Sequence, residues 1–200
     1  RYEGLNDKGE LVKVDIKKSV KTAFLSDQPT DNADYIQGTQ GADIIRAKGG
    51  DDIVYGNDGD DTIYGNDGND ALYGGKGEDK LYGGADNDVI YGDEGDDTIY
   101  GNEGDDTLYG GDGDDEIYGG EGNDEIEGGA GNNTIYGNEG DDKIYGGGDD
   151  DTIDGGEGND FLYGDNGNDT IDGGSGNDTI KGSYGDDHIE GGDGNDKIYG

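Results

Sequence analysis

Acidic residues recur at a fixed interval along most of this chain, and they are its side chains best suited to bind a metal ion. From residue 43 to residue 196 an aspartate recurs every nine residues, with one interruption at Asn133. Hard divalent cations bind about six to eight oxygen atoms, which carboxylates and backbone carbonyls supply together. The candidate metal ligands are Asp43, Asp52, Asp61, Asp70, Asp79, Asp88, Asp97, Asp106, Asp115, Asp124, Asp142, Asp151, Asp160, Asp169, Asp178, Asp187 and Asp196.

The other side-chain types exclude several chemistries. The chain has no cysteine, and its one histidine is His188. The sequence therefore excludes disulfides, zinc thiolate sites and thiol catalysis, and it offers transition metals few of their usual ligands. Because no pair of carboxylates marks a distinct cleft, we expect no enzymatic activity within these residues.

A nine-residue unit positions the aspartates. Residues 38 to 199 divide into 18 consecutive nonapeptides without insertion or deletion, of which Gly56 to Tyr64 is typical. Position six holds the aspartate, position eight is always aliphatic, and position four is glycine except at Asp86 and Asp149. Positions seven to nine suit a short strand, and the glycines of positions one to six suit a turn. Two units would close one coil, and stacked coils would form two parallel sheets around the aliphatic residues.

The unit matches the pattern G-G-x-G-x-D-x-U-x, in which U is a large aliphatic residue. Over residues 38–199 the chain resembles the RTX (repeats-in-toxin) family of calcium-binding repeats. The resemblance implies an all-β fold, a right-handed parallel β-roll (β-solenoid) with two nonapeptides per coil and about nine coils. It also implies Ca²⁺ ions between adjacent turns, held by the position-six aspartates and loop carbonyls. Up to about 16 interturn sites follow, and Mg²⁺ suits them less because it keeps its waters.

Composition makes folding depend on that metal. The net charge is −39, there are 47 glycines, and only 26% of residues are hydrophobic. Strands about 4.7–4.9 Å apart hold the carboxylates well within the Debye length of about 8–10 Å, so salt does not screen their repulsion. We expect the chain to be disordered without Ca²⁺ and to fold when Ca²⁺ binds. The expected weak points are Asn133, which removes a carboxylate, and Asp86 and Asp149, which replace turn glycines.

The same features define the expected partners and location. The acidity disfavours nucleic acids and anionic membranes, and no apolar run reaches the ~20 residues that cross a bilayer. The resemblance implies a protein secreted through a type I channel, hence an extracellular or bacterial cell-surface location. Two alternatives are a structural segment of a surface adhesin or fibre, and the accessory roll of an exported enzyme or toxin. A disordered chain is the outcome expected if Ca²⁺ produces no order.

Residues 1–37 lack the repeat and form either a strand-containing cap or a linker to another domain, whereas residues 38–200 form the roll. Residues 12–16 alternate apolar and polar side chains as a strand does, and residues 26–34 are expected to form a loop. Residues 34–36 are in phase with the repeat and read as a degenerate first unit that caps the roll. Because the chain begins with Arg1 and ends within a repeat, we expect it to be a fragment or a processed product.

Tyrosine occupies position nine in 12 of the 18 units. Stacked coils would align these rings in exposed ladders that shield the outer faces of the sheets. Alternatively, the ladders could contact glycans, another protein or a second copy of the chain. The two predicted ladders are Tyr64, Tyr82, Tyr100, Tyr118 and Tyr136 on one sheet, and Tyr55, Tyr73, Tyr91 and Tyr109 on the other.

Overall fold

The computed structural model describes residues 2–5, 11–14 and 29–200, and every regular element in these ranges is a strand. Strands β1 (Tyr2–Leu5) and β2 (Leu11–Val14) form a two-stranded antiparallel sheet. Strand β2 overlaps the strand expected at residues 12–16, of which residues 15 and 16 lie outside the described residues. The remaining strands are β3 (Tyr35–Gln37), β4 (Ile44–Gly49), β5 (Ile53–Asp58), β6 (Thr62–Asp67), β7 (Ala71–Lys76), β8 (Lys80–Ala85), β9 (Val89–Glu94), β10 (Thr98–Glu103), β11 (Thr107–Asp112), β12 (Glu116–Glu121), β13 (Glu125–Ala130), β14 (Thr134–Glu139), β15 (Lys143–Gly148), β16 (Thr152–Glu157), β17 (Phe161–Asn166), β18 (Thr170–Asp172), β19 (Thr179–Tyr184), β20 (His188–Glu190) and β21 (Lys197–Tyr199).

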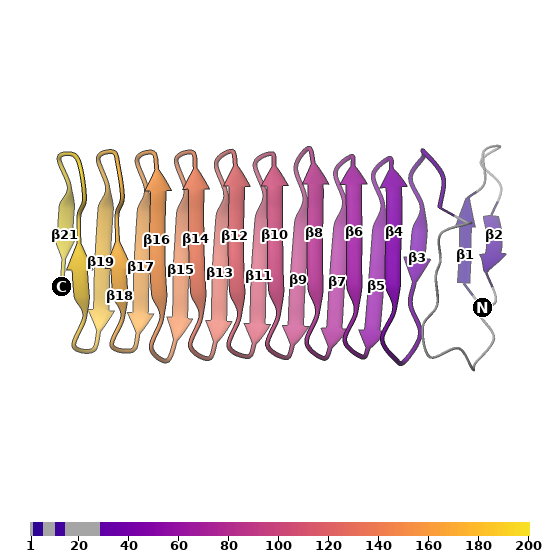
Figure 1. Cartoon of the computed structure of the whole chain (residues 1–200), viewed down its shortest axis with the longest axis horizontal. Coiled ribbons are helices and arrows are strands. Elements are labelled where there is room, and N and C mark those ends of the chain that lie inside the picture. The colour runs from indigo at the N-terminus through magenta and orange to yellow at the C-terminus, as the bar shows by residue number, and fades with distance from the viewer. Residues whose placement is uncertain (1, 6–10, 15–28) are drawn as a thin grey trace.

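Strands β3 to β21 form two parallel sheets that face each other along the whole roll (Figure 1). The even-numbered strands β4 to β20 form a nine-stranded sheet, and the odd-numbered strands β3 to β21 form a ten-stranded sheet. Each strand pairs with the strand two further along the chain, so Ile99 lies between Leu81 and Ile117. This register of 18 residues confirms the predicted parallel β-roll with two nonapeptides per coil and about nine coils.

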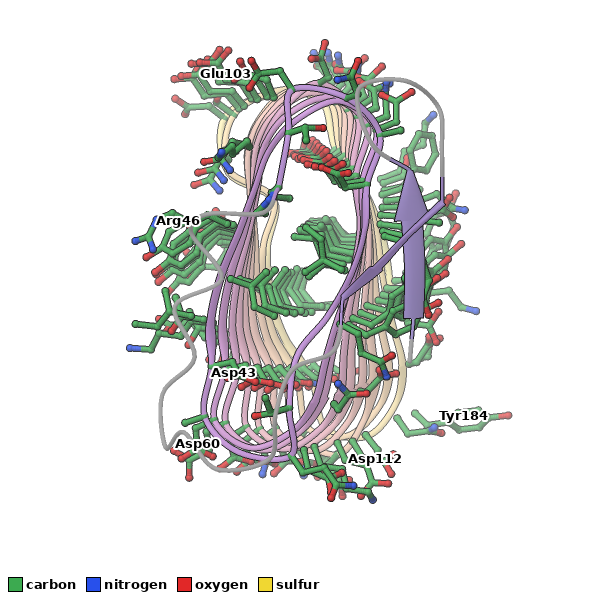
Figure 2. The ribbon with its side chains drawn as sticks, turned by 90° about the vertical axis from the view of Figure 1, so that its right-hand side faces the viewer. Asp43, Arg46, Asp60, Glu103, Asp112 and Tyr184 are labelled. Carbon is green, nitrogen blue, oxygen red and sulfur yellow. The ribbon has the colours of Figure 1, made fainter. Side chains whose placement is uncertain are left out.

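The core is the stack of position-eight side chains between the two sheets (Figure 2). From Ile45 to Ile180 every one of these aliphatic residues is at most 1% exposed. At the last coil the cover is lost, and Ile198 is 49% exposed. Alternation along a strand sends positions seven and nine outward, which leaves one apolar side chain per strand to hold the sheets together.

The roll begins before residue 38. Strand β3 pairs in parallel with β5, and Ile36 lies beside Val54 and joins the core. Residues 29–34 contain no strand, as expected for a loop, and residues 26–28 lie outside the described residues. The assignment of residues 1–37 to a cap or a linker remains a prediction, although residues 35–37 already follow the strand pairing of the roll.

The turns depend on backbone with positive φ. From Lys48 onward, positions two and four of every unit have φ between 70° and 154°. Two of the three predicted weak points, Asp86 and Asp149, adopt the same conformation, with φ values of 74° and 72°. Aspartate tolerates the left-handed region better than most residues, so both turns keep the path of their neighbours. The requirement at position two was not predicted, although glycine, asparagine and aspartate dominate there.

Both predicted tyrosine ladders are present. Neighbouring rings have centroids 4.5 to 4.9 Å apart and planes within 11° of parallel. Arg46 lies 4.6 Å from the ring centroid of Tyr64, where the first ladder begins. Because the rings stack along the axis of the roll, their faces cover one another and only their edges reach solvent. The rings of the two ladders are therefore half-buried.

Replacing a core residue tests this arrangement. We expect Ile99→Ala to lower the free energy of unfolding by about 2–5 kcal/mol, because the change removes a fully buried side chain from a continuous stack. Urea unfolding of the folded chain measures the effect. The control Thr98→Ala alters the adjacent outward-facing position and should change stability by about 0.5 kcal/mol or less. Equal losses for the two variants would contradict the assignment of the core.

Candidate metal centre

The turns at the two edges of the roll each hold one row of position-six side chains. Figure 2 shows the row that begins at Asp43 inside the lower turns, whereas Asp60 of the neighbouring position lies outside them. The backbone register places residues 18 apart in adjacent coils, so the predicted pair Asp61 and Asp79 is brought together. One row is Asp43, Asp61, Asp79, Asp97, Asp115, Asn133, Asp151, Asp169 and Asp187, and the other is Asp34, Asp52, Asp70, Asp88, Asp106, Asp124, Asp142, Asp160, Asp178 and Asp196.

A backbone hydrogen bond fixes one oxygen of each carboxylate. The N–H of Asp61 donates to Oδ1 of Asp79 at 2.7 Å, and the N–H of Asp79 donates to Oδ1 of Asp97 at 2.8 Å. The same bond recurs along both rows. Each aspartate therefore ties its own coil to the previous one and is held in a single orientation.

The second oxygen, Oδ2, is buried and has no hydrogen-bond partner in most of the row members. An ionised carboxylate oxygen in this state is costly to bury. Glycine at position one forms one wall of the space beside it: a Cβ added at Gly101 would lie 2.3 Å from Oδ2 of Asp106 and 2.5 Å from the carbonyl oxygen of Gly119. The atoms concerned are Oδ2 of Asp52, Asp61, Asp70, Asp79, Asp88, Asp97, Asp106, Asp115, Asp124, Asp142, Asp151, Asp160, Asp169 and Asp178.

This donor set fits a hard cation. Partnerless carboxylate oxygens and backbone carbonyl oxygens lie around the same glycine Cα atoms, and both are ligands that Ca²⁺ prefers. No group of three or more histidine, cysteine, aspartate or glutamate side chains gathers at one point in the described part of the chain. A bound cation would therefore need backbone carbonyls in addition to the aspartates, as the sequence predicted.

The electrostatics of the two rows also favour a nearby positive charge. Burial raises the pKa of Asp97 to about 8, and repulsion from Asp79 and Asp115 contributes to the increase. For Asp61, burial followed by repulsion from Asp79 and Asp43 raises the pKa to about 7. In both residues the backbone hydrogen bond to Oδ1 acts in the opposite direction. Burial therefore makes the ionised form of these aspartates less favourable unless a cation is nearby.

Asn133 keeps one contact of the aspartate that it replaces and changes the other. Its Oδ1 accepts the N–H of Asp115 at 3.0 Å, so the link between coils is preserved. Its Nδ2 takes the place of Oδ2 and lies 3.3 Å from the carbonyl oxygen of Gly131, to which it donates. Asparagine at this position therefore lacks the partnerless oxygen, and its amide forms a hydrogen bond with the loop carbonyl of Gly131.

Sequence reasoning missed the roles of Thr30 and Thr39. The N–H of Thr39 donates to Oδ2 of Asp43 at 2.5 Å, and its hydroxyl lies 2.8 Å from the same oxygen. Thr30 bonds Oδ2 of Asp34 in the same way, at 2.6 Å and 3.1 Å. Threonine at position two, four residues before the aspartate, was the available signal.

Comparison with protein-family models finds the RTX calcium-binding nonapeptide repeat, a model of four copies. The matches cover residues 30–63, 55–90, 64–99, 91–126, 118–153, 127–162, 145–180 and 172–200, which run without a gap from residue 30 to the last residue. The chain belongs to the RTX calcium-binding nonapeptide repeat family. The RTX roll is thus a repeat fold that implies Ca²⁺ binding, and not an enzymatic fold.

A search among curated proteins finds no match to this RTX chain. Within its described residues, no helix is long and apolar enough to cross a membrane.

The raised pKa values predict how the RTX roll responds to pH in the absence of Ca²⁺. Several row aspartates have folded-state pKa values of about 6 to 8 against a usual value of 3.8, so the folded roll binds more protons than the unfolded chain. Its stability should rise as the pH falls through 8 to 6, and the full gain requires a pH below 3.8.

We expect the far-ultraviolet circular dichroism spectrum in EDTA to gain β character between pH 8.5 and pH 5, at constant ionic strength and above the isoelectric point of about 4.1. A spectrum that stays unchanged, or loses β character on acidification, would contradict the buried rows.

Replacing Asn133 by aspartate should complete its row. The variant Asn133→Asp restores Oδ2 and frees the carbonyl of Gly131, so we expect about one additional Ca²⁺ per folded chain. Equilibrium dialysis with metal analysis measures the number bound. The control Asn132→Asp makes the same change of charge at the neighbouring exposed position and should add none. An equal increase in both variants would indicate unspecific binding by surface charge.

Proposed function

We propose that the chain is a calcium-dependent folding module, disordered without Ca²⁺ and folded when Ca²⁺ binds. The observation that supports this proposal most directly is the set of fourteen buried Oδ2 atoms without a hydrogen-bond partner. Such a row is unfavourable in the folded chain alone, whereas a cation beside each oxygen would make it favourable. The unfolded chain has no assembled ligand sets, so the free energy of metal binding becomes free energy of folding.

Charge accounts for the dependence on metal. The chain has a net charge of −39, and the register stacks its row aspartates in adjacent coils. Strands about 4.7–4.9 Å apart bring the carboxylates well within the Debye length of about 8–10 Å. Without metal these carboxylates must either repel one another or take up protons. Because each coil pairs only with its neighbours, binding in one coil favours the next and the transition should be cooperative.

The proposed ligands are the seventeen position-six aspartates of the repeat, namely the fourteen with a partnerless Oδ2 together with Asp43, Asp187 and Asp196. Turn carbonyls such as that of Gly119 would complete each ligand set. The 18 units lie nine to a row, so up to about 16 sites lie between successive turns. Ca²⁺ suits such mixed, all-oxygen sets better than Mg²⁺, which demands a small octahedral shell and keeps several waters.

Secretion would give Ca²⁺-dependent folding a biological role. The family resemblance favours secretion through a type I channel and an extracellular or cell-surface location. Extracellular calcium modules commonly have dissociation constants of about 10⁻⁴–10⁻³ M. A chain with sites of this affinity would stay unfolded at cytosolic Ca²⁺ concentrations and fold outside the cell.

A second role, as a structural segment that contacts other proteins, is favoured by one face of the roll. On the odd-numbered sheet the outward residues Ile53, Ala71 and Val89 lie beside the tyrosine ladder, and Ile53 is 40% exposed. This uncharged strip suits contact with a protein surface. It suits glycans less, because stacking covers the ring faces that sugars bind. The accessory roll of an exported enzyme or toxin remains compatible with the folding switch.

A titration of the Ca²⁺-free chain tests the switch. We expect Ca²⁺ between zero and ~10 mM, a range that covers extracellular affinities, to convert a coil-like circular dichroism spectrum into a β spectrum. EDTA should reverse the change, and Mg²⁺ at the same concentrations should not reproduce it. A spectrum that stays coil-like, or an equal response to Mg²⁺, would contradict the proposal.

A further inference from the structure

The first turn at each edge of the roll satisfies its aspartate with protein donors. Asp43 begins one row, and its Oδ2 receives the N–H of Thr39 at 2.5 Å with the hydroxyl 2.8 Å away. Asp34 begins the other row, and its Oδ2 receives the N–H of Thr30 at 2.6 Å with the hydroxyl 3.1 Å away. Neither oxygen is among the buried atoms that lack a partner. Beginning with Asp52 and Asp61, the next aspartates in each row have a partnerless Oδ2.

The backbone of these two turns also differs from that of all later turns. Every unit from Lys48 onward has positive φ at positions two and four. Thr30 and Asn32, which hold those positions in the first turn, are not in this region, and neither are Thr39 and Gly41 in the second. A β-branched residue strongly disfavours positive φ, so threonine at position two is compatible only with the alternative turn.

The alternative turn also occupies carbonyl oxygens that face the ligand space elsewhere. The hydroxyl of Thr39 lies 3.0 Å from the carbonyl oxygen of Gly41, so its one proton can serve either that oxygen or Asp43. In the next coil, Nδ2 of Asn57 donates to the carbonyl oxygen of Gly38 at 3.0 Å. These contacts leave few oxygen atoms of the turn available to a cation.

We infer that the turns of residues 29–34 and 38–43 bind no Ca²⁺ and form a metal-independent first coil. There Thr30 and Thr39 supply hydrogen-bond donors to Oδ2, in place of the Ca²⁺ ions proposed for later turns. The first turn of each row has no calcium-binding turn before it, and an interturn site requires one on both sides. Protein donors are therefore needed at the Oδ2 of this first turn. The inference removes Asp43 from the proposed ligands and rests on the proposed function for the remaining ones.

The first coil still passes on the register of the roll. The N–H of Asp34 donates to Oδ1 of Asp52 at 2.6 Å, and the N–H of Asp43 donates to Oδ1 of Asp61 at 2.6 Å. The next two aspartates are thus already oriented by a coil that needs no ion of its own. Ca²⁺ binding at Asp52 and Asp61 then adds to a surface that protein hydrogen bonds have shaped.

The experiment compares two matched variants of the whole chain, Asp43→Asn and Asp61→Asn. They lie in the same row in adjacent coils, and Asn133 shows that the row accommodates asparagine. Ca²⁺ bound per chain is measured by equilibrium dialysis at saturation, with folding checked by circular dichroism. We expect Asp61→Asn to lose about one Ca²⁺ and Asp43→Asn to lose none. Equal losses in both variants would overturn the inference.

A third variant separates the role of the hydroxyl from that of the carboxylate. Thr39→Val keeps the β-branched shape and removes the hydroxyl beside Asp43. We expect its bound Ca²⁺ to be unchanged and its thermal unfolding in saturating Ca²⁺ to shift downward by a few degrees. A gain of bound Ca²⁺ in this variant, with no loss of stability, would show that Asp43 is a latent metal ligand and would overturn the inference.

The wild-type chain provides the remaining control. If it binds no Ca²⁺, the proposed function fails, whereas equal losses in Asp43→Asn and Asp61→Asn overturn only the metal-independent coil.

Discussion

The rest of the roll depends on how each coil accommodates a buried carboxylate stacked on that of the previous coil. One oxygen causes no difficulty, because Oδ1 of Asp97 accepts the N–H of Asp79 at 2.8 Å and thereby joins two coils. The other oxygen has no partner, and burial together with the neighbouring charges raises the pKa of Asp97 to about 8. The side chain that sets the register is therefore also the one that opposes the folded state. A proton, a cation or a nearby hydrogen-bond donor can remove this opposition, and the coil spacing requires one of them at almost every turn.

The exposed position-five row shows a different solution. There, the N–H and Nδ2 of Asn123 both donate to Oδ1 of Asp105, at 2.8 and 3.0 Å. These bonds hold the pKa of Asp105 below its usual value. Asparagines are interspersed with the aspartates of this row, as at Asn123 between Asp105 and Asp141, so amide donors separate the charges and solvent screens the rest. The buried rows contain one asparagine, Asn133, and this contrast within one turn agrees with the proposed binding of a cation by the buried rows.

The sequence predicted the fold well because every interaction along the roll repeats with the same period. Position eight alone was sufficient to place the core, and position nine predicted the stacks from Tyr55 to Tyr109 and from Tyr64 to Tyr136. The details of the site were harder to predict. Whether Oδ1 or Oδ2 of an aspartate bonds the neighbouring coil depends on turn geometry, and the left-handed residues at position two follow from that same geometry. Thr39 was missed because a single departure from a consensus has no meaning until its contact with Asp43 is known.

Several of the repeated contacts between coils are interrupted near the middle of the roll. Sheet pairing, ring stacking and the aspartate rows all link residues 18 apart, so a departure from the repeat weakens two interfaces at once. On the odd-numbered sheet, Glu127 separates the rings of Tyr109 and Tyr145. On the even-numbered sheet, Asp154 ends the ladder at Tyr136. In the buried row, Asn133 replaces a carboxylate. These three changes fall within two coils, whereas Lys143 and Glu125 form a compensating ion pair across the same interface at 2.6 Å. That pair is solvent-exposed and contributes little, so it cannot replace the lost contacts. The long tyrosine stacks therefore belong to the coils up to β14, and between β13 and β16 the coils are held mainly by sheet pairing and the core.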